Sequence, residues 1–242
     1  MNKQLEDWGQ SRFGKLWNYK DIIWFLALFL FFEFCWKLAV HQGEKESILL
    51  VLGRNLTHYT EGFNRFTAQI THWVVSDIFG HKDFLIDGHS IYFEDSLRVD
   101  IIWGCTGLKQ LFMFSFIMIF YFGPKTKKYW FIPLSLVILT LVNIVRLSAI
   151  CMIIKEPFPD WFIAVNEWYN NRTWINSPEC YWQFYTDWFN VFHRDAFTWI
   201  YYDGVIFVLW LVWEELINRP YQKLLKKDEK SSQDNPNQHQ VS

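Results

Sequence analysis

The sequence predicts a mainly α-helical, polytopic membrane protein with about four transmembrane helices, and two observations carry that prediction. The first is a set of apolar stretches, each close to the roughly 20 residues that a helix needs to cross a bilayer. They are residues 22–40, 108–122, 130–154 and 197–217. The second is an aromatic content of 21%, with 15 Trp residues. This content is typical of proteins whose aromatic side chains gather at the lipid–water interface.

Basic residues near the span ends predict the orientation, because Lys and Arg are enriched on the cytoplasmic side. They precede the first span, fill the loop after the second and follow the fourth, as Lys3, Arg12, Lys15, Lys20, Lys125, Lys127, Lys128, Arg219, Lys223, Lys226 and Lys227. Residues 1–20 are therefore expected to be a cytoplasmic N-terminus, and residues 21–217 a single integral-membrane domain. Residues 218–242 are expected to be a cytoplasmic tail, disordered because it is polar.

The outer segment between the first two spans is expected to hold an amphipathic helix and a small sheet. Apolar residues recur at helical intervals and predict a long helix on or against the membrane: Leu49, Leu52, Leu56, Phe63, Phe66, Ile70, Trp73 and Val74. An Asp87-Gly88 pair between two β-prone runs predicts a β-hairpin over residues 84–93. Alternation over residues 97–102 predicts a third strand that leads straight to Cys105 at the start of a membrane helix.

Cys105 is a candidate nucleophile in the run Gly104-Cys105-Thr106-Gly107. A helix N-terminus favours the thiolate, which is the reactive form of cysteine. The flanking glycines permit a tight strand-to-helix turn and the close approach of a substrate backbone. The alternative is a small buried hydrophobic residue, which is how we interpret Cys35 in the first span.

Arg146 is a candidate anion-binding residue inside the third span. A guanidinium at that depth costs about 2.5 kcal/mol or more, so it is expected to face a protein interior or a wet cavity. Its fork of donors suits a developing oxyanion or a substrate carboxylate, and Asn143, one turn away, is a candidate to orient it. The alternative is an ion pair with Asp203 or Glu33, although Glu33 also has Lys37 at i+4.

His193 precedes the fourth span on the same predicted face as Cys105 and Arg146. Its ordinary pKa of about 6.5 suits a general acid or base. Taken alone, an interfacial His is more often a surface residue. Its occurrence with Cys105 and Arg146 favours a catalytic role.

These residues resemble the signature elements of the exosortase/archaeosortase family. The resemblance rests on Cys105-Thr106-Gly107-Leu108 at a helix start, Asn143-Ile144-Val145-Arg146 in the next helix and Phe192-His193 before the last. The family often has Ser where Thr106 stands, and many members have about eight spans rather than four.

The resemblance implies a membrane-embedded cysteine peptidase or transpeptidase of the bacterial inner membrane, with its active site on the extracytoplasmic side. Its substrates would be membrane-anchored secreted proteins that carry a C-terminal sorting signal, namely a short motif, a transmembrane helix and a basic cluster. Cys105 would then attack the scissile carbonyl, His193 would move protons and Arg146 would stabilise charge or position the peptide.

Other features of the sequence leave alternatives open. No cofactor, metal or nucleic acid is expected. The spacing of the residues that could hold a metal fits no strong zinc pattern: His72, Asp77, His81, Asp83, Asp87 and His89. Cys151 and Cys180 are predicted outside, where a disulfide is possible. Aromatic residues between Trp161 and Trp188 either rest on the lipid interface or line a peptide cleft. A transporter with Arg146, Asp203 and Glu33 along its path, and a non-catalytic chaperone or receptor, are the rival functions; acyl transfer is a closer variant.

Overall fold

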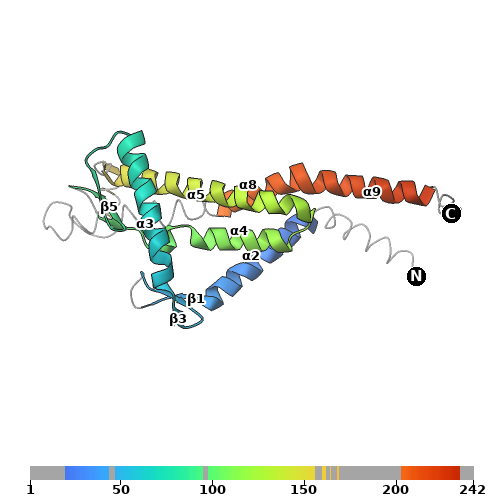
Figure 1. Cartoon of the computed structure of the whole chain (residues 1–242), viewed down its shortest axis with the longest axis horizontal. Helices are drawn as coiled ribbons and strands as arrows, with labels where there is room; N and C mark the ends of the chain where they lie inside the picture. The colour runs from blue at the N-terminus through green and yellow to red at the C-terminus, as the bar shows by residue number, and fades with distance from the viewer. Residues whose placement is uncertain are drawn as a thin grey trace.

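The fold places a group of helices at one end and small sheets at the other. A computed structural model describes residues 20–43, 47–94, 98–155, 160–161, 164, 168 and 203–234. Helices α2 (Lys20–Ala39), α4 (Leu108–Phe120), α5 (Lys125–Lys155) and α8 (Gly204–Trp213) run broadly along the long axis (Figure 1). Helix α3 (Thr57–Trp73) crosses the other helices near the sheet end (Figure 1).

Helix α4 is the centre of the helical group, since it contacts α2, α5 and α8. Its inward side chains Phe114, Ile117 and Met118 are completely buried and pack in one apolar cluster with Trp210 and Trp213 of α8. Apolar side chains also point outward, above all on α2, where Phe25 is the one buried residue of the helix. An apolar outer surface of this kind is suited to contact with lipid.

Two helices among the described residues are long and apolar enough to cross a membrane, Lys20–Ala39 and Lys125–Ile153. The predicted span at residues 108–122 is shorter than expected, because α4 ends at Phe120, where Tyr121 becomes extended. Its 13 residues rise about 20 Å, against a bilayer core of about 30 Å. The predicted span at residues 197–217 begins outside the described residues, so the count of about four crossings stays a prediction.

The predicted hairpin is confirmed. Strands β4 (Phe84–Asp87) and β5 (Ser90–Phe93) pair antiparallel with Asp87 opposite Ser90, and Gly88 adopts a φ of 65° in the turn. Strand β6 (Val99–Asp100) pairs with β5, although it is shorter than predicted. The side chain of Ser90 donates to the Asp100 carboxylate across this pair.

A second sheet was not predicted. Its strands β1 (Val40–Gln42), β2 (Leu49–Val51) and β3 (Arg54–Asn55) follow α2 and precede α3. The predicted amphipathic helix is therefore wrong at its start, because Leu49 lies in a strand and Leu52 lies in a turn with a φ of 49°. Helix α3 begins only at Thr57 and continues into a π-helical turn, η1 (Val74–Ile78).

Lys155 fastens the end of α5 to the hairpin. Its Nζ donates to the Asp83 carboxylate at 2.8 Å and lies 3.1 Å from His81 Nδ1. It also stands 4.5 Å above the ring of Phe93. The hydrogen bond from Lys155 holds the pKa of Asp83 below its usual value. Lys155 thus links the hairpin, whose sheet precedes Cys105 in the chain, to α5, whose side chains contact Cys105.

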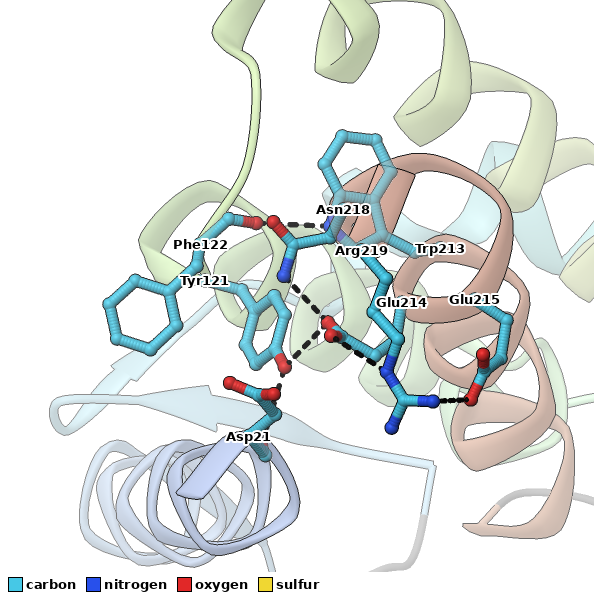
Figure 2. A network of polar contacts seen from close by, with 8 residues as sticks. All are labelled: Asp21, Tyr121, Phe122, Trp213, Glu214, Glu215, Asn218 and Arg219. Atoms are coloured by element: carbon cyan, nitrogen blue, oxygen red, sulfur yellow. Dashed lines mark hydrogen bonds and ion pairs between the residues drawn. The ribbon is translucent and has the colours of Figure 1, made fainter. Parts of the chain in front are cut away.

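At the opposite end, a polar network joins α4, α8 and α2 around Glu214 (Figure 2). Glu214 begins the π-helical turn η5 (Glu214–Asn218) and is 1% exposed. The Tyr121 hydroxyl donates to Glu214 Oε2 at 3.0 Å, and Asn218 Nδ2 donates to the same oxygen at 2.7 Å. A buried carboxylate is tolerated only with such donors, so this network fixes the junction of the helices.

The tail was predicted to be disordered, and that prediction is wrong for most of its length. Helix α9 (Arg219–Asp234) continues α8 and η5 beyond the helical group (Figure 1). The composition of the tail is polar, but its charged and uncharged residues are mostly good helix formers, and the helix is already nucleated by α8.

Candidate active site

Cys105 lies in a short turn between the hairpin sheet and α4. From β6 the chain passes through Ile101 and Ile102 into a 3₁₀ turn, η2 (Trp103–Cys105), and reaches α4 after Thr106 and Gly107. Cys105 is 6% exposed and packs in the apolar cluster that also contains Ile101 and Leu147. The sheet therefore leads the chain to Cys105, three residues before α4 begins.

The position of Cys105 relative to the helix differs from the prediction. It was expected at the start of a membrane helix, but α4 begins at Leu108, after Gly107 with a φ of 78°. The Cys105 N–H donates to the carbonyl of Ile102 at 2.8 Å and thus closes the 3₁₀ turn. The N-terminus of α4 therefore explains an activated Cys105 thiol less well than expected, because the influence of the helix dipole falls off within the first turn.

Two side chains of α5 converge on the backbone carbonyl of Cys105. Asn143 Nδ2 donates to this oxygen at 2.9 Å, and Arg146 Nη2 donates to it at 3.2 Å. Their spacing of three residues puts both on one face of the helix. Asn143 and Arg146 are 4% and 1% exposed, so the contact is buried. The structure thus brings Cys105, Asn143 and Arg146 together, whereas their catalytic roles stay predictions.

Thr106 and Gly107 shape this contact. The Thr106 hydroxyl donates to the Trp103 carbonyl at 2.7 Å and is buried, so it stabilises the turn. Gly107 lies against Asn143, because a Cβ added at Gly107 would stand 3.4 Å from Asn143 Cγ. A side chain at Gly107 would meet both this neighbour and an unfavourable backbone conformation.

The predicted acidic partners of Arg146 lie elsewhere. Glu33 pairs with Lys109 at 2.8 Å and with Lys37 at 3.5 Å. Asp203 is within electrostatic range of Lys109 and Glu33. Among the described residues, neither acid forms an ion pair with Arg146, so that alternative is wrong. The burial of Arg146 is instead linked to the turn that carries Cys105.

Cys151 also belongs to this region, although it was predicted to lie outside the membrane. It is a buried free thiol of α5 in the same apolar cluster as Cys105. Cys180, its predicted disulfide partner, lies outside the described residues. So do His193 and most of the aromatic loop; of the loop's described residues, Trp161 and Trp168 are exposed.

Helix α3 covers the site with its polar face, which sequence reasoning missed. It contacts η2 and α5. The buried side chains of α3 are small or polar, namely Thr60, Asn64, Thr67, Ala68 and Thr71. Their spacing places them on one face of the helix, and this pattern could have identified the buried face. The sequence prediction relied instead on the apolar stripe. Phe66 and Trp73 of that apolar stripe are half exposed, at 49% and 54%.

Residues 47–165 match the family model described as "Transmembrane exosortase". The match covers strands β2 to β6, α3, the Cys105 turn, α4 and α5, and so includes Cys105, Asn143 and Arg146. The match confirms the resemblance to the exosortase family seen in the sequence, and that family implies a membrane location. Neither the curated proteins nor the solved structures that were searched contain a significant match.

Proposed function

We propose that the chain is a membrane-embedded cysteine peptidase or transpeptidase that processes membrane-anchored secreted proteins at a C-terminal sorting signal. Cys105 is the nucleophile, His193 the acid and base, and Arg146 the stabiliser of developing charge. The observation that carries this proposal is the convergence of Asn143 and Arg146 on the carbonyl of Cys105. This contact holds the buried guanidinium of Arg146 against the backbone of Cys105. A cation close to a cysteine favours its thiolate form.

The backbone of Cys105 supports a side-chain role in charge stabilisation. In many acyl-transfer enzymes the N–H of the nucleophile donates to the oxyanion. Here the Cys105 N–H is bonded to Ile102, so a different donor has to take that part. Arg146 approaches the same residue from α5 with a fixed fork of N–H donors, and it contacts the backbone of Cys105 directly.

The reaction proceeds through a thioester. The Cys105 thiolate adds to the scissile carbonyl carbon, and the carbonyl electron pair moves onto oxygen, where Arg146 stabilises it. Collapse of this intermediate breaks the C–N bond, and His193, which holds the proton taken from the Cys105 thiol, gives it to the leaving amine. Water or a nucleophilic acceptor then gives its proton to His193 and attacks the thioester carbonyl, and the C–S bond breaks to regenerate the thiolate. The acceptor alone distinguishes hydrolysis from transpeptidation.

The proposed location is the bacterial inner membrane, with several crossings and with Cys105 on the extracytoplasmic side. The basic residues support it, because Lys125, Lys127 and Lys128 form the first turn of α5, just beyond the end of α4 that is opposite Cys105. Arg219 follows Glu214, which Tyr121 contacts at that same end of α4. The sheets and α3 would then lie outside the cytoplasm, where a secreted substrate is presented.

The test is processing of a co-encoded secreted protein that ends in a short motif, an apolar helix and a basic cluster. Cys105→Ala and His193→Ala should each lower the processing rate by about 10⁴-fold, and the double variant should lose little more, because both serve one step. Cys35→Ala is the matched control, since Cys35 lies in α2 and should process normally. Normal processing by Cys105→Ala at unchanged abundance would exclude the proposal.

Arg146→Lys separates catalysis from scaffolding. Lysine keeps the charge but loses the planar fork, so processing should fall by about 10²-fold or more while abundance stays near normal. A variant that processes at the normal rate would reduce Arg146 to a structural residue. Cys105 and His193 would then act without it.

A further inference from the structure

A basic pocket lies at the end of the molecule opposite Cys105, and neither the fold nor the proposed function has used it. It has a volume of about 580 Å³ and lies between the start of α2, the end of α4 and the first turns of α9. This volume falls within the range of about 300–1,000 Å³ that is typical of ligand sites. The cations that line it are Lys20, Arg219, Lys223 and Lys226.

Three cations of α9 lie on one side of the helix. Arg219, Lys223 and Lys226 follow one another at helical spacing, so three successive side chains face the same pocket. Neither Lys223 nor Lys226 forms an ion pair with any acidic side chain that the structure describes, which on α9 means residues 219–227. Two such ammonium groups over one pocket attract an anion.

Two acidic residues, Asp21 and Glu214, also line the pocket, and Glu214 is neutralised by its own neighbours. Glu214 accepts from Tyr121 and Asn218, and Arg219 Nε lies 3.7 Å from its other oxygen (Figure 2). Glu215, outside the pocket, binds the guanidinium of Arg219 at 2.5 Å. These contacts hold Arg219 at the rim and leave Lys223 and Lys226 as the cations that an incoming anion would meet.

The inner wall of the pocket is aromatic. Trp24 of α2 and Phe122 stack with ring centroids 5.5 Å apart, and both line the pocket. The apolar face of α2 continues from Trp24 through Ala27 and Phe31, which are exposed. A ligand that is anionic at one end and apolar at the other therefore matches this wall, because Trp side chains rest at the level of lipid headgroups.

We propose that this pocket binds the headgroup of an anionic phospholipid, with the phosphate between Lys223 and Lys226 and the acyl chains along α2. A lipid headgroup and a soluble phosphate both present a phosphate oxyanion to the lysines. The aromatic wall of the pocket favours the lipid. The proposal depends on the membrane location of the chain and not on its proposed catalytic activity. A failed processing assay leaves it standing, and a failed lipid assay leaves the cysteine chemistry standing.

The test is lipid retention by the full chain in detergent, measured by native mass spectrometry with phosphatidylglycerol and phosphatidylcholine. Lys223→Gln/Lys226→Gln removes the pocket cations, and Lys127→Gln/Lys227→Gln removes the same charge from the same end outside the pocket. Each surface cation strengthens binding to an anionic lipid by about fivefold, so the pocket variant should bind phosphatidylglycerol about 25-fold more weakly. The wild-type chain and the control variant should retain phosphatidylglycerol and prefer it to phosphatidylcholine.

Three results would overturn the proposal. The first is unchanged retention of phosphatidylglycerol by the pocket variant. The second is an equal loss in the control variant, which would indicate general surface charge rather than a pocket. The third is full displacement of the bound lipid by an equimolar amount of glycerol phosphate, which would identify a soluble phosphate as the ligand.

Discussion

Gly107 is the residue on which the geometry of the Cys105 turn depends. Its φ of 78° is a conformation that costs a residue with a Cβ about 1–2 kcal/mol. We expect Gly107→Ala to lower the thermal unfolding temperature of the chain and to weaken processing, because this backbone strain disturbs the turn that presents the Cys105 carbonyl to Asn143.

Gly104→Ala is the matched control for that substitution. Gly104 lies in the same turn, has no atom within 4 Å of an added Cβ and has no positive φ. The Gly104→Ala variant should leave the unfolding temperature unchanged. Equal unfolding temperatures for the two variants would show that the turn does not depend on Gly107.

For single residues, the residue types of the site and their spacing were more predictable than the atoms that they contact. The spacing of Asn143 and Arg146 predicted a shared face, and the glycines around Cys105 predicted a tight turn. The acceptor that joins them, the carbonyl of Cys105, could not be predicted, because its direction depends on the 3₁₀ turn and on the packing of α4 against α5. For the same reason the proposed ion pairs of Arg146 were wrong.

Helix α3 is the element that covers the Cys105 turn, and Ala68 is at the centre of its buried stripe. Ala68 has no exposed surface, and the helix contacts both η2 and α5. Ala68→Leu should overpack this contact, at a cost of about 1–3 kcal/mol, and should lower processing by moving α3 away from the site. Processing rate and unfolding temperature are the measurements.

Gln69→Leu is the control on the same helix. Gln69 is exposed, so a leucine there should change the free energy of unfolding by no more than about 0.5 kcal/mol. The processing rate should be unchanged. If Ala68→Leu behaves like Gln69→Leu, α3 is not seated on the site as described.

The elements themselves were predicted unevenly. The hairpin was predictable because Asp87-Gly88 is a local turn signal. The start of α3 and the sheet of β1, β2 and β3 were not, because short strands depend on pairing partners that a local pattern does not reveal. The apolar stripe of α3 was real, but in a membrane protein the exposed face of a helix is also apolar, so the stripe did not identify the buried side.

The orientation of the whole molecule rests on its basic residues and is directly testable. On a background without native cysteines, Glu94→Cys should react with an impermeant thiol reagent added outside, since Glu94 is exposed beside the hairpin. Thr126→Cys and Lys227→Cys are exposed at the opposite end and should react only after the membrane is permeabilised. Labelling of Thr126→Cys in intact cells would reverse the topology.

For the whole molecule, the membrane class was predictable from apolar length, whereas the extent of each span was not. Helix α4 was overestimated because Tyr121 and Phe122 are aromatic and continue the apolar run, yet the chain leaves the helix at Tyr121 to meet Glu214. Helix α9 was missed because polar composition was interpreted as disorder, although a preceding helix lowers the cost of continuing one.

The central claim is that Cys105 forms a thioester with the substrate. The most direct measurement is the mass of the Cys105 peptide after the chain is trapped with its co-encoded substrate during processing. We expect a hydroxylamine-sensitive adduct on Cys105 with the mass of the cleaved substrate, and none on Cys35 or Cys151. Substrate cleavage at the normal rate without an adduct on Cys105, or with the adduct on another cysteine, would contradict the account.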